Sequence, residues 1–201
     1  MGAGMTDIAA VILAAGRATR WRASGGAEPT KLVAPWRGRP LVRAVAEAAL
    51  ASRAAGVFVV TGHESEAVRA ALDGLAVRFV ANPDYAQGLS TSLRAGLNAV
   101  APTADGAAIL LGDMPLVSAD LIDALIAAFE GRADALAAAP RGETGLGNPV
   151  VLSRALFAQA MALGGDKGAR ALVEAAGARR VEIAWATAET TMDVDEAGAP
   201  E

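Results

Sequence analysis

A short apolar run near the start of the chain constrains the fold more than any other feature. Ile8–Leu13 contains only apolar residues, and it is followed by Ala14-Ala15-Gly16 and then by Arg17 and Arg20. A short, continuous apolar run is typical of a strand that is buried on both faces of a sheet. Open α/β sheets bind ligands at the carboxyl ends of such strands, where small residues let backbone N–H groups approach a phosphate. We therefore expect a phosphate-binding loop directly after the first strand.

Strand-like and helix-like segments alternate along most of the chain. The predicted strands are Ile8–Leu13, Val57–Thr61, Val77–Val80, Ala107–Leu111, Asp134–Ala139, Asn148–Leu152 and Arg180–Ala184. The predicted helices are Leu41–Ala54, Glu64–Leu72, Ser90–Ala99, Ser118–Phe129, 153–162 and Ala169–Ala176. The segment Ala14–Gly38 is predicted to be one long loop. This alternation indicates an α/β fold with a mostly parallel, Rossmann-like sheet between two layers of helices. We expect one domain over residues 1–201, with residues 1–6 as a mobile tail.

Composition excludes several classes of function. Hydrophobic residues make up 53% of the 201 residues, so a large core can form. The net charge of −4 argues against nucleic-acid binding. The absence of cysteine and the single histidine, His63, argue against disulfides, thiolate metal sites and a histidine relay. We see no membrane-spanning run and no secretion signal, and therefore expect a cytoplasmic protein.

Three polar segments follow predicted strands and should meet at one edge of the sheet. They are the loop after Leu13, the segment Asn82–Ser92, and Asp113. A carboxylate at the position of Asp113 can hold Mg²⁺, which binds through few carboxylates together with substrate phosphates. Asp193 and Asp195 lie two residues apart in an expected extended segment, so their side chains share one face, and one or both could complete the metal site. We give His63 a structural role only.

The two common nucleotide-binding fingerprints are absent. Gly16 does not begin a GxGxxG pattern, and Lys31 is not part of a GK[ST] motif. A Rossmann oxidoreductase and a P-loop ATPase are therefore both disfavoured. A crevice with a small-residue loop, a lysine, arginines and separated carboxylates suits phosphoryl or nucleotidyl transfer, which depends on positioning and charge neutralisation.

Several motifs in order resemble one family. The segment Leu13-Ala14-Ala15-Gly16 with Arg20 and Lys31-Leu32 resembles the LAAGxxxRMGxxK signature of the MobA-like nucleotidyltransferases, whose fold is of the nucleotide-diphospho-sugar transferase (GT-A-like) type. The stretches that resemble its molybdenum cofactor cytidylyltransferase (MocA-like) branch are Asn82–Gly96, Gly112–Pro115, Gly147–Val150, Gly164–Arg170 and Asp193–Asp195. The resemblance is collinear over about residues 8–196, and six motifs in one order are far more specific than any one of them.

The resemblance implies an activity and a set of site residues. It implies transfer of CMP from CTP to the phosphate of molybdopterin with Mg²⁺, and possible delivery of the product to a molybdenum hydroxylase or its chaperone. Lys31, Arg20 and Asp113 would be catalytic, and Asp113 and Asp195 would hold the metal. The nucleotide would be bound by Leu13, Ala14, Ala15, Gly16, Arg17, Arg20, Lys31, Asn82, Gly88 and Ser92, and the acceptor by Asn148, Asp166 and Lys167.

The chain departs from the family pattern in three places, which leaves alternatives open. Trp21 replaces the usual methionine, about nine extra residues (22–30) precede Lys31, and the usual Asp-Thr-Pro-Glu-Asp ending is absent after Asp195. One alternative is a transferase that uses GTP or another small phosphorylated acceptor. The other is a non-catalytic carrier or chaperone of the molybdenum cofactor.

Overall fold

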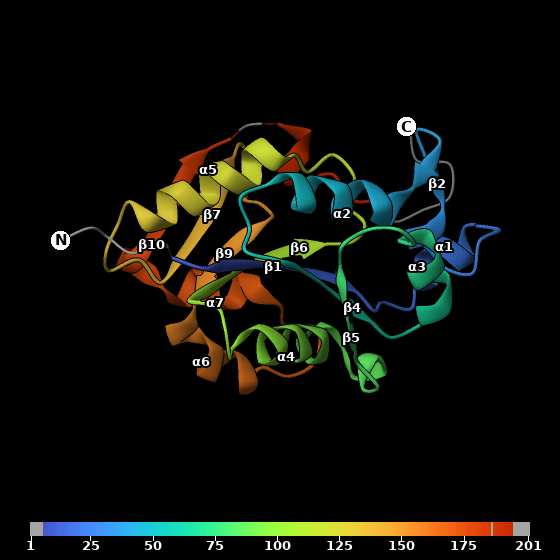
Figure 1. The fold of residues 1–201 in the computed structure, drawn as a ribbon, viewed down its shortest axis with the longest axis horizontal. Coiled ribbons are helices and arrows are strands. Elements are labelled where there is room, and N and C mark those ends of the chain that lie inside the picture. Colours follow the sequence, from blue (N-terminus) through green and yellow to red (C-terminus); the bar gives the residue numbers. More distant parts are fainter. Residues whose placement is uncertain (1–5, 186, 195–201) are drawn as a thin grey trace.

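The computed structural model describes residues 6–185 and 187–194. Residues 1–5 of the expected mobile tail lie outside this range. Asp195, the expected second metal ligand, also lies outside it. Within them the main sheet has eight strands in the order β10-β7-β9-β6-β1-β4-β5, with β8 paired to β7 (Figure 1). The strands are β1 (Ile8–Ala14), β4 (Val57–Thr61), β5 (Arg78–Ala81), β6 (Gly106–Leu111), β7 (Ala137–Gly142), β8 (Gly145–Leu146), β9 (Val150–Ser153) and β10 (Arg180–Ala184).

Strand direction confirms the predicted fold class. The strands β6, β1, β4 and β5 are parallel neighbours, and β7 is parallel to β10. The strand β9 runs antiparallel to both β6 and β7 and thereby joins the two parallel groups. The carboxyl ends of β4, β1 and β6 therefore lie side by side at one edge of the sheet.

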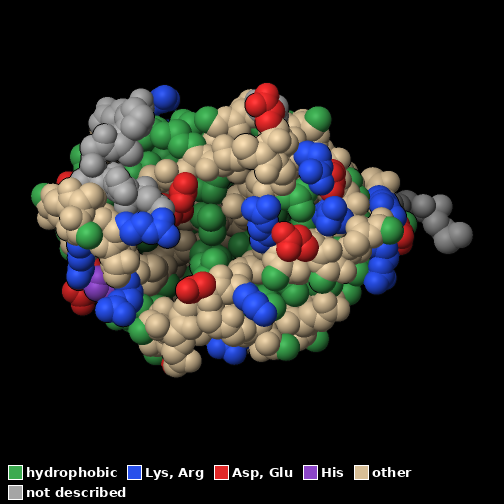
Figure 2. All heavy atoms as spheres, turned by 180° about the vertical axis from the view of Figure 1, so that it is seen from behind, with side chains coloured by type: hydrophobic (Ala, Val, Ile, Leu, Met, Phe, Trp, Pro, Cys, Tyr) green, Lys and Arg blue, Asp and Glu red, His purple; other side chains and the backbone are tan. Residues whose placement is uncertain are grey.

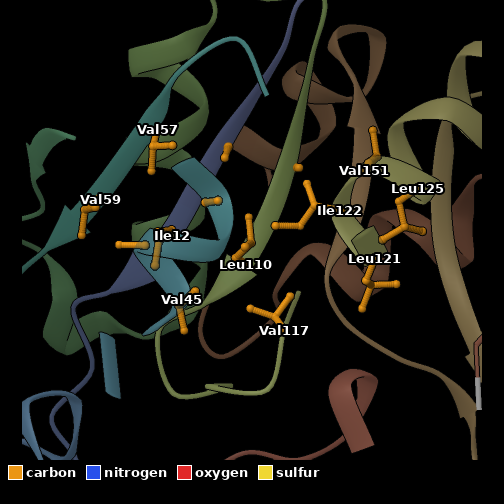
Figure 3. Packing of buried hydrophobic residues seen from close by; sticks show 14 of the residues in the cluster. Ile12, Val45, Val57, Val59, Leu110, Val117, Leu121, Ile122, Leu125 and Val151 are labelled. Carbon is orange, nitrogen blue, oxygen red and sulfur yellow. The ribbon is translucent and has the colours of Figure 1, made fainter. Parts of the chain in front are cut away.

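Helices cover both faces of the sheet, as Figure 1 shows. One face packs against α2 (Leu41–Ala51), α3 (Ser65–Ala71) and α5 (Ala119–Glu130), and the other against α4 (Leu89–Val100), α6 (Phe157–Met161) and α7 (Ala169–Ala175). Alternate residues of β1 enter opposite cores, so Ile12 lies in the first core and Val11 in the second. Figure 3 shows Ile12 and Leu110 facing the apolar side chains of the first core, among them Val45, Leu121 and Leu125. All seven residues of β1 are buried for this reason.

The segment predicted as one long loop contains defined structure, so that prediction was wrong. It holds the short helix α1 (Thr19–Ala23), the 3-10 turn η1 (Lys31–Val33) and the first strand of a hairpin of β2 (Pro35–Trp36) and β3 (Arg39–Pro40). A small third core of Trp21, Ala34, Trp36, Leu41 and Val194 holds these pieces together. Elements of two to five residues carry no detectable periodicity, and they form because their apolar side chains meet residues distant in sequence.

The remaining differences are the short strand β8, which lies where no element is predicted, and the ends of elements. The helix predicted over 153–162 is a 3-10 turn, η3 (Arg154–Leu156), followed by α6, and α2 ends at Ala51 rather than at residue 54. Two more 3-10 turns are η2 (Tyr85–Gln87) and η4 (Gly177–Arg179), and η5 (Ala188–Thr190) lies just before the described chain ends. Across 6–185 and 187–194, no helix combines the length and apolar character that crossing a membrane requires.

Candidate active site

The loop after β1 is joined by backbone hydrogen bonds to the loops after its two neighbouring strands. The Gly112 N–H donates to Leu13 O at 3.0 Å, and the His63 N–H donates to Ala15 O at 3.3 Å. A Cβ placed on Gly16 would meet no atom within 4 Å, so this glycine faces open space. The end of β1 is thus held rigidly, while the residues just after it present exposed backbone to a ligand.

A cavity of about 380 Å³ opens at this edge of the sheet. Nine residues expected to bind nucleotide, metal or acceptor line it: Leu13, Ala15, Gly16, Arg17, Lys31, Gly88, Ser92, Asp113 and Asp166. The molecule is hollowed on the face that Figure 2 shows, with hydrophobic side chains at the bottom of the hollow and charged side chains of both signs around it. An apolar hollow with a few charged groups at its rim is typical of a small-molecule site.

Sequence reasoning missed seven residues that line this cavity. They are Thr19, Thr30, Leu32, Tyr85, Ala86, Leu89 and Leu111. Tyr85, Ala86 and Leu89 lie inside the polar segment Asn82–Ser92, so the sequence pattern already points to this region. The positions of Thr19, Thr30 and Leu32 depend on the folding of residues 17–33, which the sequence pattern did not reveal.

Lys31 and Asp113 form an ion pair across the cavity wall. The Nζ of Lys31 lies 2.7 Å from an Oδ of Asp113, and the side chains are 14% and 19% exposed. Lys31 begins the turn η1, and the preceding Thr30 is fully buried, with its hydroxyl accepting a hydrogen bond from the Leu32 N–H. The structure therefore brings the lysine beyond the nine-residue insertion to the carboxylate after β6. Ion pairs that are largely shielded from water are stronger than exposed ones.

A second, smaller cavity of about 210 Å³ adjoins the first on the side of α1. It is lined by Gly16, Ala18, Thr19, Arg20, Trp21, Lys31 and Asp113. Arg20 belongs to this second cavity, and Gly16, Thr19, Lys31 and Asp113 line both. Ala18 has a φ of +48°, a conformation that is uncommon outside glycine and that turns the chain sharply into α1.

Asn82 lies beneath the site rather than in the lining of the main cavity. It is 4% exposed, and its amide donates to the hydroxyls of Thr91 and Ser92 at 2.9 and 3.0 Å. Its side-chain oxygen accepts from the Asp84 N–H. Asn82 therefore fixes the loop that leads into α4 and orients Ser92, which does line the cavity.

The loop 164–168 closes the opposite side of the cavity by docking on the start of α4. The Ser90 N–H donates to Gly165 O at 3.0 Å. Gly88 has a φ of +112°, and a Cβ there would lie 2.5 Å from Gly165 O and 2.9 Å from Asp166 Oδ1. Only a glycine permits both this backbone conformation and this close approach. The docking places Asp166 at the cavity edge.

A family model for the MobA-like NTP transferase domain matches residues 10–181. The chain belongs to this family. Among curated relatives, the bifunctional protein GlmU of Sorangium cellulosum is 35% identical over 136 residues, which cover 65% of this chain and 28% of that protein. The chain spans about a quarter of the length of the curated relatives it matches.

Solved structures agree with the family. Rv0371c from Mycobacterium tuberculosis is 29% identical, with a TM-score of 0.81 and coverage of 96% of this chain and 94% of that one. A nucleotidyl transferase from Methanothermobacter is also 29% identical, with a TM-score of 0.76 and coverage of 96% and 93%. The chain is thus a nucleotidyltransferase domain of the MobA-like type.

The acceptor residues expected for this MobA-like domain are only partly brought together. Asp166 lines the main cavity, whereas Lys167 is exposed and Asn148 lies after β8, where its N–H donates to Thr190 O at 2.9 Å. Neither Lys167 nor Asn148 lines the cavities described above. Ala14 is buried at 1% exposure, so it can contribute only through its backbone.

Asp113 is the expected metal ligand that lies within the described part of the chain. The Val194 N–H donates to Asp113 O at 3.0 Å, so the segment of Asp193 and Val194 reaches the loop after β6. Across residues 6–185 and 187–194, no three acidic or histidine side chains cluster as a metal site. One or two carboxylates completed by phosphates and water are what Mg²⁺ requires, so a single Asp113 carboxylate fits that ion. Rv0371c has also been solved in complex with manganese, at 28% identity and a TM-score of 0.75 over 90% of each chain.

Proposed function

We propose that this protein transfers CMP from CTP to the phosphate of molybdopterin in a reaction that needs Mg²⁺. The observation that carries the proposal is the 2.7 Å contact between Lys31 and Asp113, at the boundary of the two cavities. It joins the N-terminal signature motif to the Gly-Asp-Met-Pro motif after β6. A cation and a metal-binding carboxylate at one point are what a transferred phosphoryl centre needs for charge neutralisation.

The two cavities suggest how CTP lies in the site. The cytidine occupies the main cavity, between the backbone of Ala14–Gly16 and the segment from Gly88 to Ser92, which Asn82 holds in place. The triphosphate passes Arg17 and Lys31 into the smaller cavity, where Arg20 neutralises its far end. Small residues at Gly16 and Gly88 allow the nucleotide to approach the backbone closely.

The reaction itself is an in-line displacement at the α-phosphorus. A phosphate oxygen of the acceptor forms a new bond to this phosphorus, and the bond from phosphorus to the bridging oxygen breaks. Pyrophosphate carries away the electron pair of that bond. Lys31 stays beside the α-phosphate and stabilises the charge that grows on its oxygens. Asp113 would hold Mg²⁺, with Asp195 as the expected second ligand, and the bound ion would supply Lewis-acid neutralisation of the phosphate charge.

The acceptor enters on the side of the loop 164–168. Asp166 at the cavity edge, with Lys167 and Asn148 farther out, would contact the pterin and its phosphate. The product would then pass to a molybdenum hydroxylase or its chaperone.

Purified protein incubated with Mg²⁺, molybdopterin and each nucleoside triphosphate in turn tests the proposal. Pyrophosphate release and a cytidine dinucleotide product are expected with CTP. Release with GTP alone would assign guanylyl transfer, and release with an unrelated phosphorylated acceptor alone would remove molybdopterin. Tight molybdopterin binding without pyrophosphate from any triphosphate would instead identify a carrier or chaperone.

A further inference from the structure

The single histidine of the chain takes part in a contact that the proposed reaction does not use. The imidazole Nε2 of His63, in the turn after β4, lies 2.6 Å from Nη2 of Arg22 on α1. The same Nη2 donates to Pro29 O at 2.9 Å and lies 3.5 Å from an Oε of Glu64. Arg22 and Pro29 lie near the two ends of the nine-residue insertion that precedes Lys31. One guanidinium nitrogen therefore ties both ends of the insertion to the sheet edge.

The chemistry of the two side chains fixes the protonation of His63 in this contact. A guanidinium has N–H donors and no acceptor, so Nε2 must accept and carries no hydrogen. The imidazole is therefore neutral, with its proton on Nδ1. The two hydrogens of Nη2 point to Pro29 O and His63 Nε2, which are nearer than the Glu64 carboxylate oxygen at 3.5 Å.

His63 is itself firmly held to the walls of the site. Its backbone N–H donates to Ala15 O, next to Gly16. Its ring packs against the ring of Tyr85, with centroids 5.9 Å apart, and Tyr85 lines the main cavity. A Cβ on Gly62 would lie 2.7 Å from the Cβ of Tyr85, so the backbone before His63 lies directly against this aromatic residue. The backbone hydrogen bond and the contact with Tyr85 therefore fix the position of His63, the partner of Arg22.

We propose that Arg22 and His63 are positioning residues that hold the insertion so that Lys31 stands at Asp113. Pro29, whose carbonyl Arg22 binds, precedes the buried Thr30, and Lys31 follows directly. We call the contact between Arg22 and His63 the clasp. The clasp anchors the nine-residue insertion and thereby fixes the backbone conformation with which the chain enters η1. The consequence for nucleotidyl transfer rests on the function proposed above, whereas the placement of Lys31 does not.

The two lysines of the chain allow a test that does not depend on activity. Brief acetylation with an amine-reactive ester, read by peptide mass spectrometry, measures the reaction rate of Lys31, and the exposed Lys167 serves as internal reference. Two variants remove the contact: Arg22→Ala, and His63→Phe, which keeps a ring beside Tyr85 but has no acceptor. In both variants the loss of one hydrogen bond should make Lys31 react at least about threefold faster. His63→Gln restores an acceptor and should return the rate towards that of the unmodified protein.

Arg132→Ala is the matched control, because it removes another exposed arginine whose partner, Asp134, lies in the loop between α5 and β7. A Lys31 rate equal to that of this control in both Arg22→Ala and His63→Phe would overturn the proposal. A parallel rise at Lys167 would also overturn it, because general loosening would then explain the change. ¹⁵N spectra of the single imidazole supply a second readout: a proton on Nδ1 is expected, and a proton on Nε2 in the unmodified protein would refute the clasp.

Transfer kinetics separate this proposal from the proposed function. The clasp variants should lower kcat while changing KM for CTP by less than about twofold, because charge stabilisation in the transition state is lost more than ground-state binding. Absence of transfer with every nucleotide would remove the proposed function, and the acetylation rates would still decide whether the clasp positions Lys31.

Discussion

Replacing Gly88 by alanine tests the docking of the loop 164–168 on α4. The new Cβ would collide with the backbone carbonyl of Gly165 and lie 2.9 Å from Asp166 Oδ1. It would also occupy a φ of +112° and a ψ of 174°, a backbone region that is essentially restricted to glycine and that costs an alanine about 1–3 kcal/mol. Separation of the loop would break the hydrogen bond from Ser90 N–H to Gly165 O, worth about 1 kcal/mol. We therefore expect the free energy of unfolding to fall by about 2–4 kcal/mol. For a chain of this size, that loss lowers Tm by roughly 4–16 °C.

Two other glycines provide matched controls for this variant. Gly74 and Gly165 also have positive φ values, of +78° and +61°, but a Cβ at either position would meet nothing within 4 Å. Gly74→Ala and Gly165→Ala therefore carry the strain of a positive φ without the collision, and their loss of unfolding free energy should be limited to about 1–2 kcal/mol.

Urea unfolding and hydrogen exchange measure the two parts of the effect. Gly88→Ala should lose protection at the Ser90 amide and raise KM for the acceptor, because Asp166 moves away from the cavity. Equal stability and equal Ser90 protection in Gly88→Ala and Gly165→Ala would refute the reasoning, since the collision would then have no consequence.

Three further predictions concern single side chains. Asp113→Ala should abolish nucleotidyl transfer and leave far-UV circular dichroism unchanged, and retained transfer would remove Asp113 from the metal site. Asn82→Ala should reduce the free energy of unfolding by about 2–3 kcal/mol in urea titrations, because the buried hydroxyls of Thr91 and Ser92 lose their donor. Hydrogen bonds from Arg141 lower the pKa of Glu182 from 4.5 to about 2. Because this pKa is lower in the folded state, Glu182 stabilises the fold above about pH 4.5, and the contribution disappears as the pH falls towards 2. With the carboxylate 28% exposed, the difference in unfolding free energy between the unmodified protein and Glu182→Gln should be about 1 kcal/mol at pH 7 and should narrow by pH 3; a gap that stays constant with pH would contradict this.

The sequence by itself determined the layered fold and the edge of the sheet where the site lies. Continuous apolar runs such as Ile8–Leu13 can be buried only between two layers of helices, and the alternation of strands and helices makes most neighbours parallel. Because β1 and β6 are parallel, the loops that follow them must lie at the same edge of the sheet. The sequence therefore predicts that Gly16, Lys31 and Asp113 lie at one edge of the sheet, and they line the same cavity.

Only the tertiary structure decided how the long segment before Lys31 is arranged. Its elements are too short to show a period, and they are fixed by contacts with residues far along the chain. Trp21 packs in one core with Val194, and Arg22 reaches His63. Likewise, the burial of Asn82 and the docking of Gly165 on Ser90 depend on partners that no local pattern specifies. Hydrophobic periodicity reports which face of an element is buried, but the choice of partner across the sequence depends on how all the surfaces pack at once.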